Sequence, residues 1–574
     1  MESARAVLEA ADAAFARNDL AAAETAYRDA IGRFGARGEW LANLGAVLVR
    51  SLRIAEALPV LEAANAALPD NPAVLSTLGY ARLEAGRTRE AIAALDRALA
   101  LDATLLDAWN NLGRAHLASG DHAAATAAFA RALALSPRYT PALSNWCDAL
   151  IARGELKAAR DLARRYADAA PDDAGTWFKY GYALTLTGEL ESARDALHRA
   201  AAREPGFPLA QHNLGSIALW QNRLDDAETH FRAELERDPG HADARFGLAS
   251  SLLKRRRAED GWREFEARAA TAGGATSRPP GGVRRWGGET LDGTLLVLPE
   301  EGLGDVLMFA RFLAEARKRV GRLVLYCDGY WAPLRRLLAS APGVDAIVDR
   351  ESGSLAVAAA IRIMSLPHAL GLSSAAFVPR GPYVAPPAAE IQRWSQRLRG
   401  HPGMRVGICW GGNPRTALPH AARIDERRSI GLARLAPLAE IPDVQFVSLQ
   451  KRGANDRPED SSLRMIDWTD ELADYADTAA LMTNLDLVIT VDTSIVHAAG
   501  AIGRPVWLLD RFDNCWRWGT EAAQPGWYPT LTVFRQRVAG DWAEVVDNVR
   551  VELGRLAARG AAQTSAGGVE APPG

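Results

Sequence analysis

The chain has 574 residues, 48% of them hydrophobic, and a formal net charge of −3. This length is enough for several domains, and the composition excludes a largely disordered chain. A charge this near neutral argues against a dedicated nucleic-acid binder, which needs a basic face. The four cysteines, Cys147, Cys327, Cys409 and Cys515, show no metal-type spacing, which favours a reducing compartment. The chain has no secretory pattern at its start and no apolar run of the roughly 18 residues that span a bilayer. We therefore expect a cytoplasmic protein without a membrane span.

A pattern with a period of 34 residues runs through the first half of the chain. A small residue marks one position of each unit, an Ala follows twelve residues later, and a Pro closes most units. The small residues are Gly45, Gly79, Gly113, Cys147, Gly181 and Gly215, the alanines are Ala57, Ala91, Ala125, Ala159, Ala193 and Ala227, and the prolines are Pro69, Pro137, Pro171, Pro205 and Pro239. Small residues let two antiparallel helices approach closely, and Pro ends a helix because it cannot continue one. Stacking then covers the apolar face that each unit leaves open.

Two weaker units flank the six regular ones. One spans residues 3–37, and the other spans residues 241–267, where Gly261 and Phe265 take the Ala and aromatic positions. Atypical end units are typical of repeat arrays. The pattern resembles the tetratricopeptide repeat and predicts an α-solenoid over residues 1–268. An Ala-rich helical bundle is the alternative, but such a bundle would not keep one phase over six units.

The helical period ends near Arg268, and the Gly- and Pro-rich residues 269–290 are expected to form a linker. Just before it, residues 254–257 read Lys-Arg-Arg-Arg. This run is either a nucleic-acid patch or a solvated helix face or capping surface. The acids that follow at once, Glu259 and Asp260, favour the helix face or capping surface.

Short apolar runs alternate with helical patterns after the linker, which predicts parallel sheets built from βαβ units. We expect strands at residues 294–298, 322–326, 356–363, 406–410, 444–449, 487–491 and 505–509, and helices at residues 306–320, 331–339 and 388–399. Two α/β halves result, residues 291–390 and residues 391–559. The tail, residues 560–574, has the low-complexity composition of a disordered segment.

Four loops at predicted strand ends could carry chemistry, because ligands bind beyond the carboxyl ends of parallel strands. The first loop contains Gly302 and Gly304, which let the backbone turn or approach a ligand closely. Asp305 follows at the start of a helix. Its carboxylate is either an N-cap, since it can accept hydrogen bonds from free amides, or a general base.

The second and third loops offer weaker signals. Gly412 and Asn413 lie in a Gly-Gly-Asn-Pro sequence that is either a tight turn or a contact for phosphate or sugar. A polar stretch follows as far as Arg428, and a helix is expected to begin just after it. Gln450 and Lys451 end another strand, where they form either a solvated loop or a contact for an anion or a base.

The fourth loop carries the strongest signal. Asp492, Thr493 and Ser494 connect a predicted strand to a helix, and His497 lies on the same helix face as Thr493. Free amides and the helix dipole favour a phosphate at such a helix start. The structural alternative is a capped helix with a His whose hydrogen bonds are satisfied.

The phrases GLGDVLMFARFL, GICWGGNP, RRSIGLARLAPL, FVSLQK, DTAALMTNLDLVITVDTSIVHAAGAIGRPVWLL and WYPTLTVFRQ occur in this order between residues 291 and 550. Together they resemble bacterial glycosyltransferase family 9, the ADP-heptose heptosyltransferase-like group, in its tetratricopeptide-fused branch. The architecture is also similar to that of protein O-linked N-acetylglucosamine transferase. The resemblance implies a two-domain GT-B-like fold, with an acceptor-side first half and a nucleotide-sugar-side second half.

The resemblance also implies roles for matching positions. Asp305 corresponds to a base that takes the proton of the acceptor hydroxyl. The residues that would bind the donor are Gly302, Gly304, Gly412, Asn413, Arg428, Gln450, Lys451, Asp492, Thr493, Ser494 and His497. The last four would hold the diphosphate. Arg428 would neutralise the leaving nucleotide, and Gln450 and Lys451 would contact its base. Inversion at the anomeric carbon is the expected outcome in this family.

No Asp-x-Asp sequence ends a predicted strand in the α/β halves. Metal-dependent sugar transferases use paired carboxylates to hold a divalent ion on the diphosphate. The helix start and basic side chains would supply that charge here. We therefore expect no metal site and no cofactor besides the nucleotide-sugar substrate.

These observations predict a metal-independent, nucleotide-sugar-dependent glycosyltransferase, whose repeats present a protein or peptide acceptor in their groove. A first alternative is a tetratricopeptide scaffold with a degenerate, inactive transferase domain, which the short first half keeps open. A second is an envelope-glycan transferase that uses its repeats for assembly. The sugar, the nucleotide and the acceptor do not follow from the residues.

Overall fold

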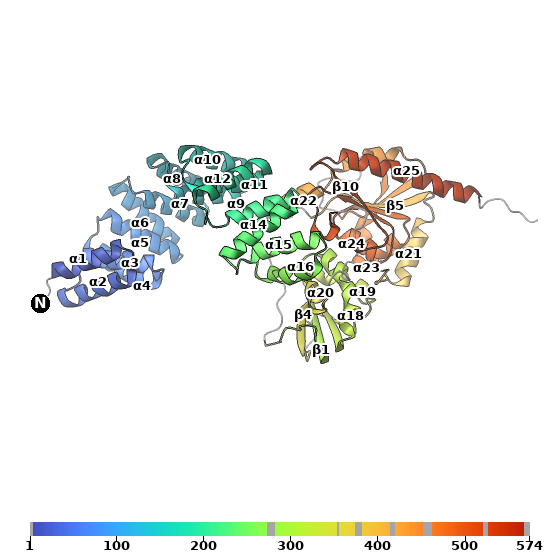
Figure 1. The fold of residues 1–574 in the computed structure, drawn as a ribbon, viewed down its shortest axis with the longest axis horizontal. Helices are drawn as coiled ribbons and strands as arrows, with labels where there is room; N and C mark the ends of the chain where they lie inside the picture. The colour runs from blue at the N-terminus through green and yellow to red at the C-terminus, as the bar shows by residue number, and fades with distance from the viewer. Residues whose placement is uncertain are drawn as a thin grey trace, which may run out of the picture. The chain divides into compact units, whose positions relative to one another are not determined.

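The computed structural model describes residues 4–271, 282–352, 355–372, 381–413, 419–451, 462–520 and 526–566. Its internal contacts divide the chain into two compact units, Met1–Ala210 and Gln211–Gly574. Helices build the described part of the first unit, and the second combines helices with sheets (Figure 1).

The first unit consists of antiparallel helix pairs that follow the predicted 34-residue period. Its helices are α1 (Ala4–Ala16), α2 (Leu20–Phe34), α3 (Gly38–Arg50), α4 (Ile54–Ala67), α5 (Pro72–Glu84), α6 (Thr88–Leu101), α7 (Leu106–Ser119), α8 (His122–Leu135), α9 (Thr140–Ala152), α10 (Leu156–Ala169), α11 (Ala174–Thr187) and α12 (Leu190–Arg203). The small positions lie where paired helices meet. A Cβ atom on Gly113 would lie 2.6 Å from the ring of Phe129, and one on Gly79 would lie 2.6 Å from Leu95. The repeat prediction is confirmed for these pairs.

The second unit begins with two more helix pairs. These are α13 (Ala210–Trp220), α14 (Leu224–Arg237), α15 (Ala242–Lys254) and α16 (Ala258–Phe265), and the 3₁₀ helix η1 (Glu266–Ala270) follows. Gly261 takes its predicted place, since a Cβ there would lie 2.7 Å from Leu253. The boundary between the compact units, at residue 210, thus falls inside the predicted solenoid of residues 1–268.

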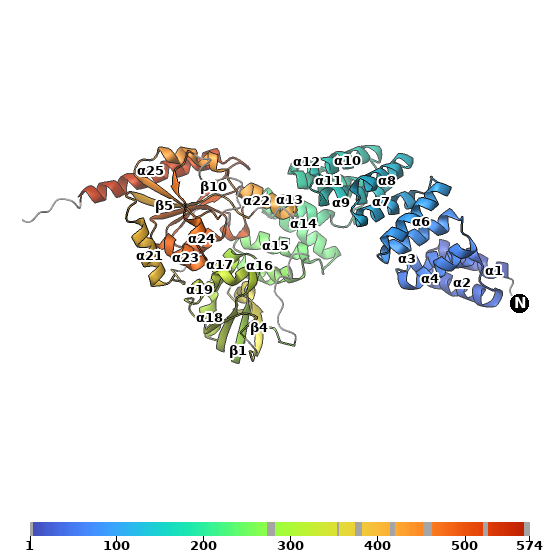
Figure 2. The ribbon, with the colours of Figure 1, turned by 180° about the vertical axis from the view of Figure 1, so that it is seen from behind.

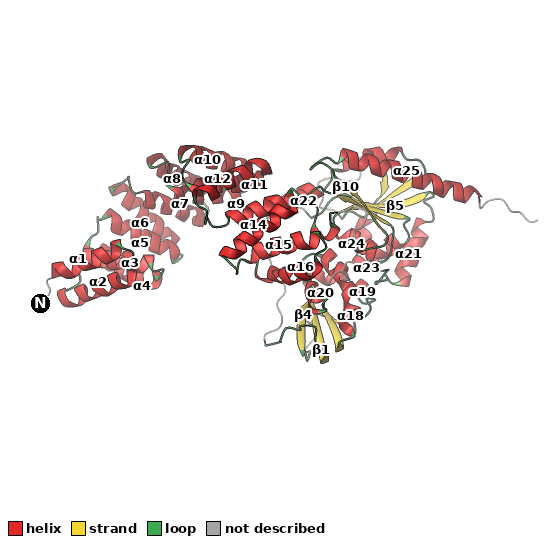
Figure 3. Cartoon of the chain, in the orientation of Figure 1, coloured by secondary structure: helices red, strands yellow, loops and turns green. Residues whose placement is uncertain are grey.

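Two parallel sheets follow (Figure 3). The first has the order β3-β2-β1-β4 and the second the order β10-β9-β8-β5-β6-β7, and neighbouring strands of the described residues run parallel. The strands are β1 (Leu291–Leu298), β2 (Val320–Tyr326), β3 (Ala346–Val348), β4 (Ala359–Arg362), β5 (Met404–Cys409), β6 (Val444–Ser448), β7 (Met465–Ile466), β8 (Leu487–Val491), β9 (Val506–Asp510) and β10 (Leu531–Arg535). The α/β class is therefore confirmed, with one sheet in each predicted half.

The longest apolar runs became the central strands, and the missed strands lie at or near the sheet edges. β3 and β7 are short edge strands with half-buried residues, and β10 is an edge strand in which buried and exposed residues mix. Edge strands lack the continuous apolar run that marks a strand covered on both faces.

Three predicted helices differ in detail. Residues 306–320 form α17 (Leu303–Phe309), η2 (Ala310–Phe312) and α18 (Leu313–Arg317), and residues 331–339 form η3 (Gly329–Leu334) and α19 (Arg335–Leu338). The helix expected after Arg428 instead precedes it as α22 (Pro419–Arg428), and the 3₁₀ helix η6 (Leu432–Glu440) follows. The internal Pro333 and Pro437 explain the 3₁₀ segments, because Pro removes a helical hydrogen bond.

The remaining helices are α20 (Leu366–Ala369), α21 (Ala388–Leu398), α23 (Tyr475–Thr483), α24 (Ser494–Ala501) and α25 (Ala543–Ala566), and the 3₁₀ helices are η4 (Ile363–Ser365), η8 (Thr469–Glu471) and η9 (Trp516–Trp518). α25 continues past Arg559 into the predicted disordered tail, which corrects that boundary. The sequence there is rich in Ala, the strongest helix former. The end of the tail and most of the predicted linker lie outside the described residues.

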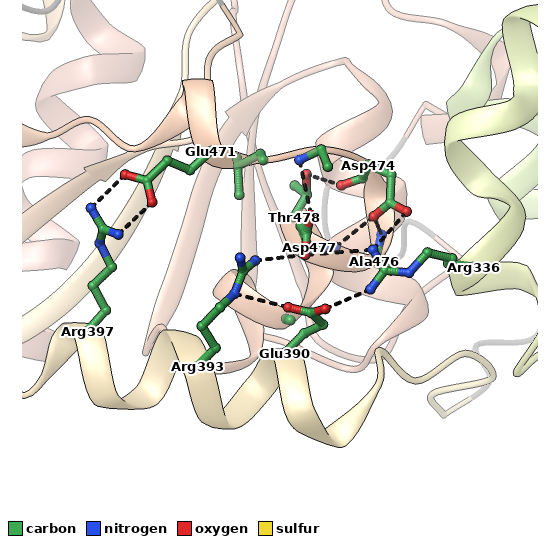
Figure 4. A network of polar contacts seen from close by, with 12 residues as sticks. Arg336, Glu390, Arg393, Arg397, Glu471, Asp474, Ala476, Asp477 and Thr478 are labelled. Atoms are coloured by element: carbon green, nitrogen blue, oxygen red, sulfur yellow. Dashed lines mark hydrogen bonds and ion pairs between the residues drawn. The ribbon is translucent and has the colours of Figure 1, made fainter.

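A network of ion pairs joins the two α/β halves (Figure 4). Arg336 of α19 contacts Glu390 of α21 (2.9 Å) and Asp474 (3.2 Å), the N-cap of α23. Arg393 of α21 contacts Asp477 of α23 at 2.8 Å. Since α21 connects the two halves along the chain, the network ties the first half to both the connection and the second half.

Candidate functional site

Three of the predicted loops follow strands at which the strand order of the sheet reverses. In the first sheet the chain runs from β1 to β2 and β3 on one side, whereas β4 lies on the other side of β1. In the second sheet β6 and β7 extend to one side of β5, and β8, β9 and β10 extend to the other. Ligands of open α/β sheets bind beyond the carboxyl ends of the strands at such a switch point. The loops after β1, β5 and β8 are all in this position.

The loop after β1 and the loop after β8 meet directly. α17 packs against α24, as Figure 2 shows from behind. A Cβ atom on Gly304 would lie 2.7 Å from Cδ2 of His497 and 3.0 Å from Cα of Ser494. Only Gly permits this approach, because the second contact is with backbone. The structure thus brings Gly304, Asp305, Ser494 and His497 together from two halves.

Both carboxylate oxygens of Asp305 have partners. The backbone N–H of Gly302, the N-cap of α17, donates to Oδ2 at 3.0 Å. Oδ1 accepts a hydrogen bond from the guanidinium of Arg517, which lies in the loop after β9. Asp305 therefore both caps α17 and connects the first half to the second.

His497 is buried and neutral at physiological pH. Its Nδ1 lies 3.0 Å from the hydroxyl of Tyr528, and its ring stacks on Trp518 with centroids 5.3 Å apart and an interplanar angle of 16°. Burial lowers its pKa to about 4, with Asp492 and Asp305 opposing and Arg517 adding to the decrease. Its contacts are those of a packed His with a satisfied nitrogen, so it supports the loop.

The turn before α24 has the geometry that the sequence predicts for a capped helix. Thr493 is the N-cap, and its hydroxyl accepts a hydrogen bond from the backbone N–H of Ile495 at 3.3 Å. The hydroxyl of Ser494 contacts the hydroxyl of Tyr475. Asp492, Thr493 and Ser494 are half-buried. The start of α24 is therefore accessible while its residues are held by local hydrogen bonds.

Around the end of β5 the structure gathers a second group of predicted residues. The side chain of Gln450 accepts a hydrogen bond from the backbone N–H of Gly411 at 2.9 Å. Arg428 forms an ion pair with Asp425 at 2.8 Å and donates to the carbonyl of Asp492 at 3.3 Å. A Cβ atom on Gly412 would lie 2.2 Å from Arg428 Nη2. Gly412 thus admits the guanidinium that connects this group to the turn before α24.

Two predicted donor residues have less defined places. Asn413 is exposed and adjoins the undescribed residues 414–418. Lys451 is also exposed, and its ammonium donates to the backbone carbonyl of Leu472. Neither residue is directed toward Asp305 by a contact that the structure shows.

Sequence reasoning missed Arg517, Trp518 and Tyr528. The guanidinium of Arg517 pairs with Asp305 and also donates to Sγ of Cys515 at 2.7 Å. Burial alone would lower its pKa, but the negative charge of Asp305 and the neighbouring Cys515 and Asp492 outweigh burial and raise it. The available signal was position, since the Trp-Arg-Trp sequence follows shortly after a predicted strand and so lies at the same sheet edge.

The last repeat supports the loop that carries Arg517. The ammonium of Lys254 donates to the carbonyl of Asn514 at 2.9 Å, and Arg256 donates to the carbonyl of Arg517 at 3.3 Å. Lys254 is only 2% exposed, and burial lowers its pKa to about 8. The basic run 254–257 was expected to be a solvated helix face or a capping surface. A solvated face is wrong for Lys254, because loop 511–519 covers it at the end of the repeats.

A buried ion pair ties the same repeat to the loop after β1. Arg268 of η1 donates to both carboxylate oxygens of Glu300, at 2.6 and 3.2 Å, and to the hydroxyl of Ser365 at 2.8 Å. Glu300 also accepts from the backbone N–H of Met364 at 3.1 Å. Both charged side chains are almost fully buried. Glu300 lies in the predicted loop after β1, so the last repeat contacts the site region at two places.

A hollow of about 780 Å³ lies near this repeat. Its walls are Asn222, Arg223, Leu224, Asp225, Asp226, Arg255, Arg257 and Thr520, and they contain none of the predicted site residues. Within the described ranges, no group of three or more His, Cys, Asp or Glu side chains is arranged to hold a metal ion. None of the helices that the structure describes has the length and apolar composition needed to cross a membrane.

Two family models of the tetratricopeptide repeat match this chain, one at residues 8–72, 76–140 and 212–275, the other at residues 116–177. The N-terminal region therefore consists of tetratricopeptide repeats. Repeats of this architecture present extended concave surfaces to partners, which gives the chain the character of a protein-interaction protein.

A curated relative is protein FlbA of Caulobacter vibrioides, 29% identical over 301 residues. The match covers 48% of each protein, so the chain spans about half the length of the curated relative it matches. Among solved structures, a tetratricopeptide repeat protein from Parabacteroides merdae is 17% identical, covers 43% of this chain and 98% of its own, and has a TM-score of 0.35. YrrB, described as a protein with an unusual peptide-binding site, is 18% identical, covers 32% and 95%, and has a TM-score of 0.26.

Proposed function

We propose that the chain is a nucleotide-sugar-dependent glycosyltransferase of GT-B-like fold, whose repeats present a protein or peptide acceptor. The observation that carries this proposal is the meeting of the loop after β1 with the turn before α24, through the contact of Gly304 with Ser494 and His497. A transfer reaction needs a base near the acceptor and a positive environment for the leaving group in one place. Residues of both kinds lie at this meeting point.

In the proposed reaction the acceptor hydroxyl oxygen attacks the anomeric carbon of the donor sugar. The bond between that carbon and the diphosphate oxygen breaks, and its electron pair leaves with the nucleoside diphosphate. The hydroxyl proton passes to a carboxylate, for which Asp305 is the candidate from the other half, next to the residue Gly304 that contacts Ser494 and His497. The free amides at the start of α24 and nearby arginines stabilise the departing charge.

A screen of nucleotide sugars by thermal shift tests the proposal. A donor present at about 100 times its Kd should stabilise the full chain by about 2.7 kcal/mol, and the stabilising donor should then be hydrolysed or transferred. Thr493→Ala should weaken this binding without unfolding the chain. If no nucleotide sugar shifts the melting curve and none is consumed, the transferase proposal fails.

The proposed transfer needs no divalent ion, because Arg428, Arg517 and the start of α24 supply positive charge at the sheet edge. Activity in excess chelator should equal activity with magnesium or manganese. Loss of turnover in chelator and its return with either ion would contradict this part of the proposal.

A scaffold role is the second candidate, and the contacts of Asp305 favour it. A carboxylate that caps a helix and pairs with a buried Arg contributes to stability without any chemistry. A scaffold would bind a protein partner through the repeats and would neither bind nor consume a nucleotide sugar, so the same screen separates the two candidates.

A further inference from the structure

Asp305 and Arg517 form an ion pair with each other. In the proposed reaction, however, Asp305 is needed as the base and a cation such as Arg517 is needed for the diphosphate. The base must present an oxygen lone pair to the acceptor hydroxyl, and the hydrogen bonds from Arg517 to Oδ1 of Asp305 and from the backbone N–H of Gly302 to Oδ2 each take one lone pair. The leaving diphosphate needs a cation, yet the guanidinium of Arg517 is held by Asp305. Asp305 therefore competes with the diphosphate for Arg517, and Arg517 competes with the acceptor hydroxyl for Oδ1.

Arg517 is held through its side chain by Asp305 and by Sγ of Cys515. Its backbone is fixed, because the carbonyl of Arg517 accepts hydrogen bonds from Trp527 Nε1 at 2.7 Å and from Arg256 at 3.3 Å. Both side chains of the ion pair keep 16% of their surface exposed, so a ligand can reach them. An exchange therefore needs a change of side-chain rotamer and no movement of the loop.

The guanidinium of Arg517 lies near the turn at which the diphosphate is proposed to bind. It is within electrostatic range of Asp492, two residues before the start of α24, and of the neutral His497. Arg is the side chain best suited to hold phosphate oxygens, since its fork forms two parallel hydrogen bonds. Arg428, which the sequence suggested for this role, is also paired, with Asp425, but only the pairing of Arg517 involves the proposed base.

We propose that Arg517 is the donor-binding cation and that the donor's diphosphate releases Asp305 by taking Arg517 from it. The inference rests on the proposed function for the identity of the ligand. Once released, Oδ1 of Asp305 accepts the proton of the acceptor hydroxyl while the C–O bond to the diphosphate breaks and its electron pair leaves with the phosphate. Asp305 keeps its capping bond to Gly302 throughout. An acceptor presented by the repeats thus meets a competent base only after the donor has bound.

Inorganic pyrophosphate is a suitable probe, because it carries the charge of the leaving group without a sugar or a base. Its Kd is measured by calorimetry on the full chain, at low salt and with chelator present. In Asp305→Asn the cap remains but the competing charge is gone, so pyrophosphate should bind at least about tenfold tighter than to the parent. In Arg517→Met binding should be at least about tenfold weaker, and the double variant should behave like Arg517→Met.

Asp474 offers a matched control. It also caps a short helix, through hydrogen bonds from Ala476 and Asp477, and it also pairs with an Arg of the other half, Arg336 at 3.2 Å (Figure 4). Asp474→Asn should leave the Kd of pyrophosphate unchanged. If Asp305→Asn melts early, Asp305→Gln replaces it, since an uncharged Gln at this third helical position can also accept from the N-cap amide.

Tighter pyrophosphate binding in Asp305→Asn together with weaker binding in Arg517→Met supports the exchange. Equal or weaker binding in Asp305→Asn overturns it, and so does an absence of pyrophosphate binding in both the parent and Asp305→Asn. The measurement does not depend on sugar transfer. If the Kd of pyrophosphate falls in Asp305→Asn and rises in Arg517→Met but no nucleotide sugar is consumed, the exchange is supported and the transferase proposal fails. If the chain is active but the two Kd values do not change in this way, the transferase proposal is supported and the exchange fails.

Discussion

The repeats of the first unit and the site of the second unit both depend on glycines that admit a neighbouring side chain, but the neighbours differ in origin. Gly113 meets Phe129 of the same repeat, whereas Gly304 meets His497, nearly two hundred residues further along the chain. The first contact recurs with the period and is local. The second exists only because two sheets bring their strand ends together. The repeats can therefore be predicted from spacing, whereas the composition of the site depends on long-range packing.

The charged pairs of the two regions differ in exposure. Arg53 of the repeats pairs with Glu56, one helical turn away, and with Glu24 of the preceding repeat, and its side chain remains 39% exposed. Asp305 and Arg517 come from different halves and are mostly shielded from water. Exposed pairs contribute little to stability, while a shielded pair can control which ligand binds.

Among the substitutions that distinguish the site from the repeats, Asp305→Asn is expected to have the largest effect, which is on turnover. We predict a loss of turnover of about 100-fold or more, because Asn cannot accept the acceptor proton. Asn can still accept the hydrogen bond from the backbone N–H of Gly302, but the melting temperature should fall, because the mostly buried guanidinium of Arg517 loses its charged partner. Turnover with the donor found in the screen and a melting curve check both expectations. Full activity would return Asp305 to a structural role and strengthen the scaffold candidate.

A local packing change in the repeats should cost stability alone. Gly113→Leu forces side-chain atoms into the ring of Phe129, and we expect overpacking to cost about 1–3 kcal/mol. Gly32→Ala in α2 is the matched control, because a Cβ atom there meets nothing within 4 Å, and Ala should be neutral or slightly stabilising in a helix. Chemical denaturation measures both. An unchanged unfolding curve for Gly113→Leu would falsify the packing of the repeat pair.

The buried His497 predicts a pH dependence that arises in the site. Its folded-state pKa of about 4 is below the unfolded value of about 6.5. The unfolded chain therefore binds more protons between these values, and stability falls as the pH falls through this window. The expected loss between pH 7.5 and 5.5 is about 1 kcal/mol from this group. His497→Gln should show a smaller loss than the parent, and parallel curves for the two proteins would contradict the assignment.

The smallest effect is expected at an exposed pair of the network in Figure 4. Arg397 of α21 contacts Glu471 at 2.5 Å, but both side chains are more than 40% exposed. Arg397→Met should cost less than about 1 kcal/mol and should not change the Kd of pyrophosphate. A larger loss of stability would mean that this network behaves as a cooperative unit.

The sequence alone predicted the repeats, the α/β class and the central strands, because each depends on a pattern that repeats along the chain. Helical spacing, apolar runs and turn residues report local preferences, and local preferences agree with the fold in these segments. The sequence also located the strand-end loops that contain Asp305 and Thr493, since parallel strands place their carboxyl ends at one edge. It did not predict the short edge strands, whose burial depends on neighbours.

The tertiary structure decided the partners of these loops. The capping bond of Asp305 to Gly302 spans three residues and follows a known helix pattern. Its pairing with Arg517 joins residues 212 positions apart and follows from no spacing. In the same way, Lys254 appears in the sequence as part of a basic helix face, and only the packing of loop 511–519 on the last repeat buries it. Long-range contacts depend on how whole elements pack, because that packing decides which side chains lose their water and which keep it.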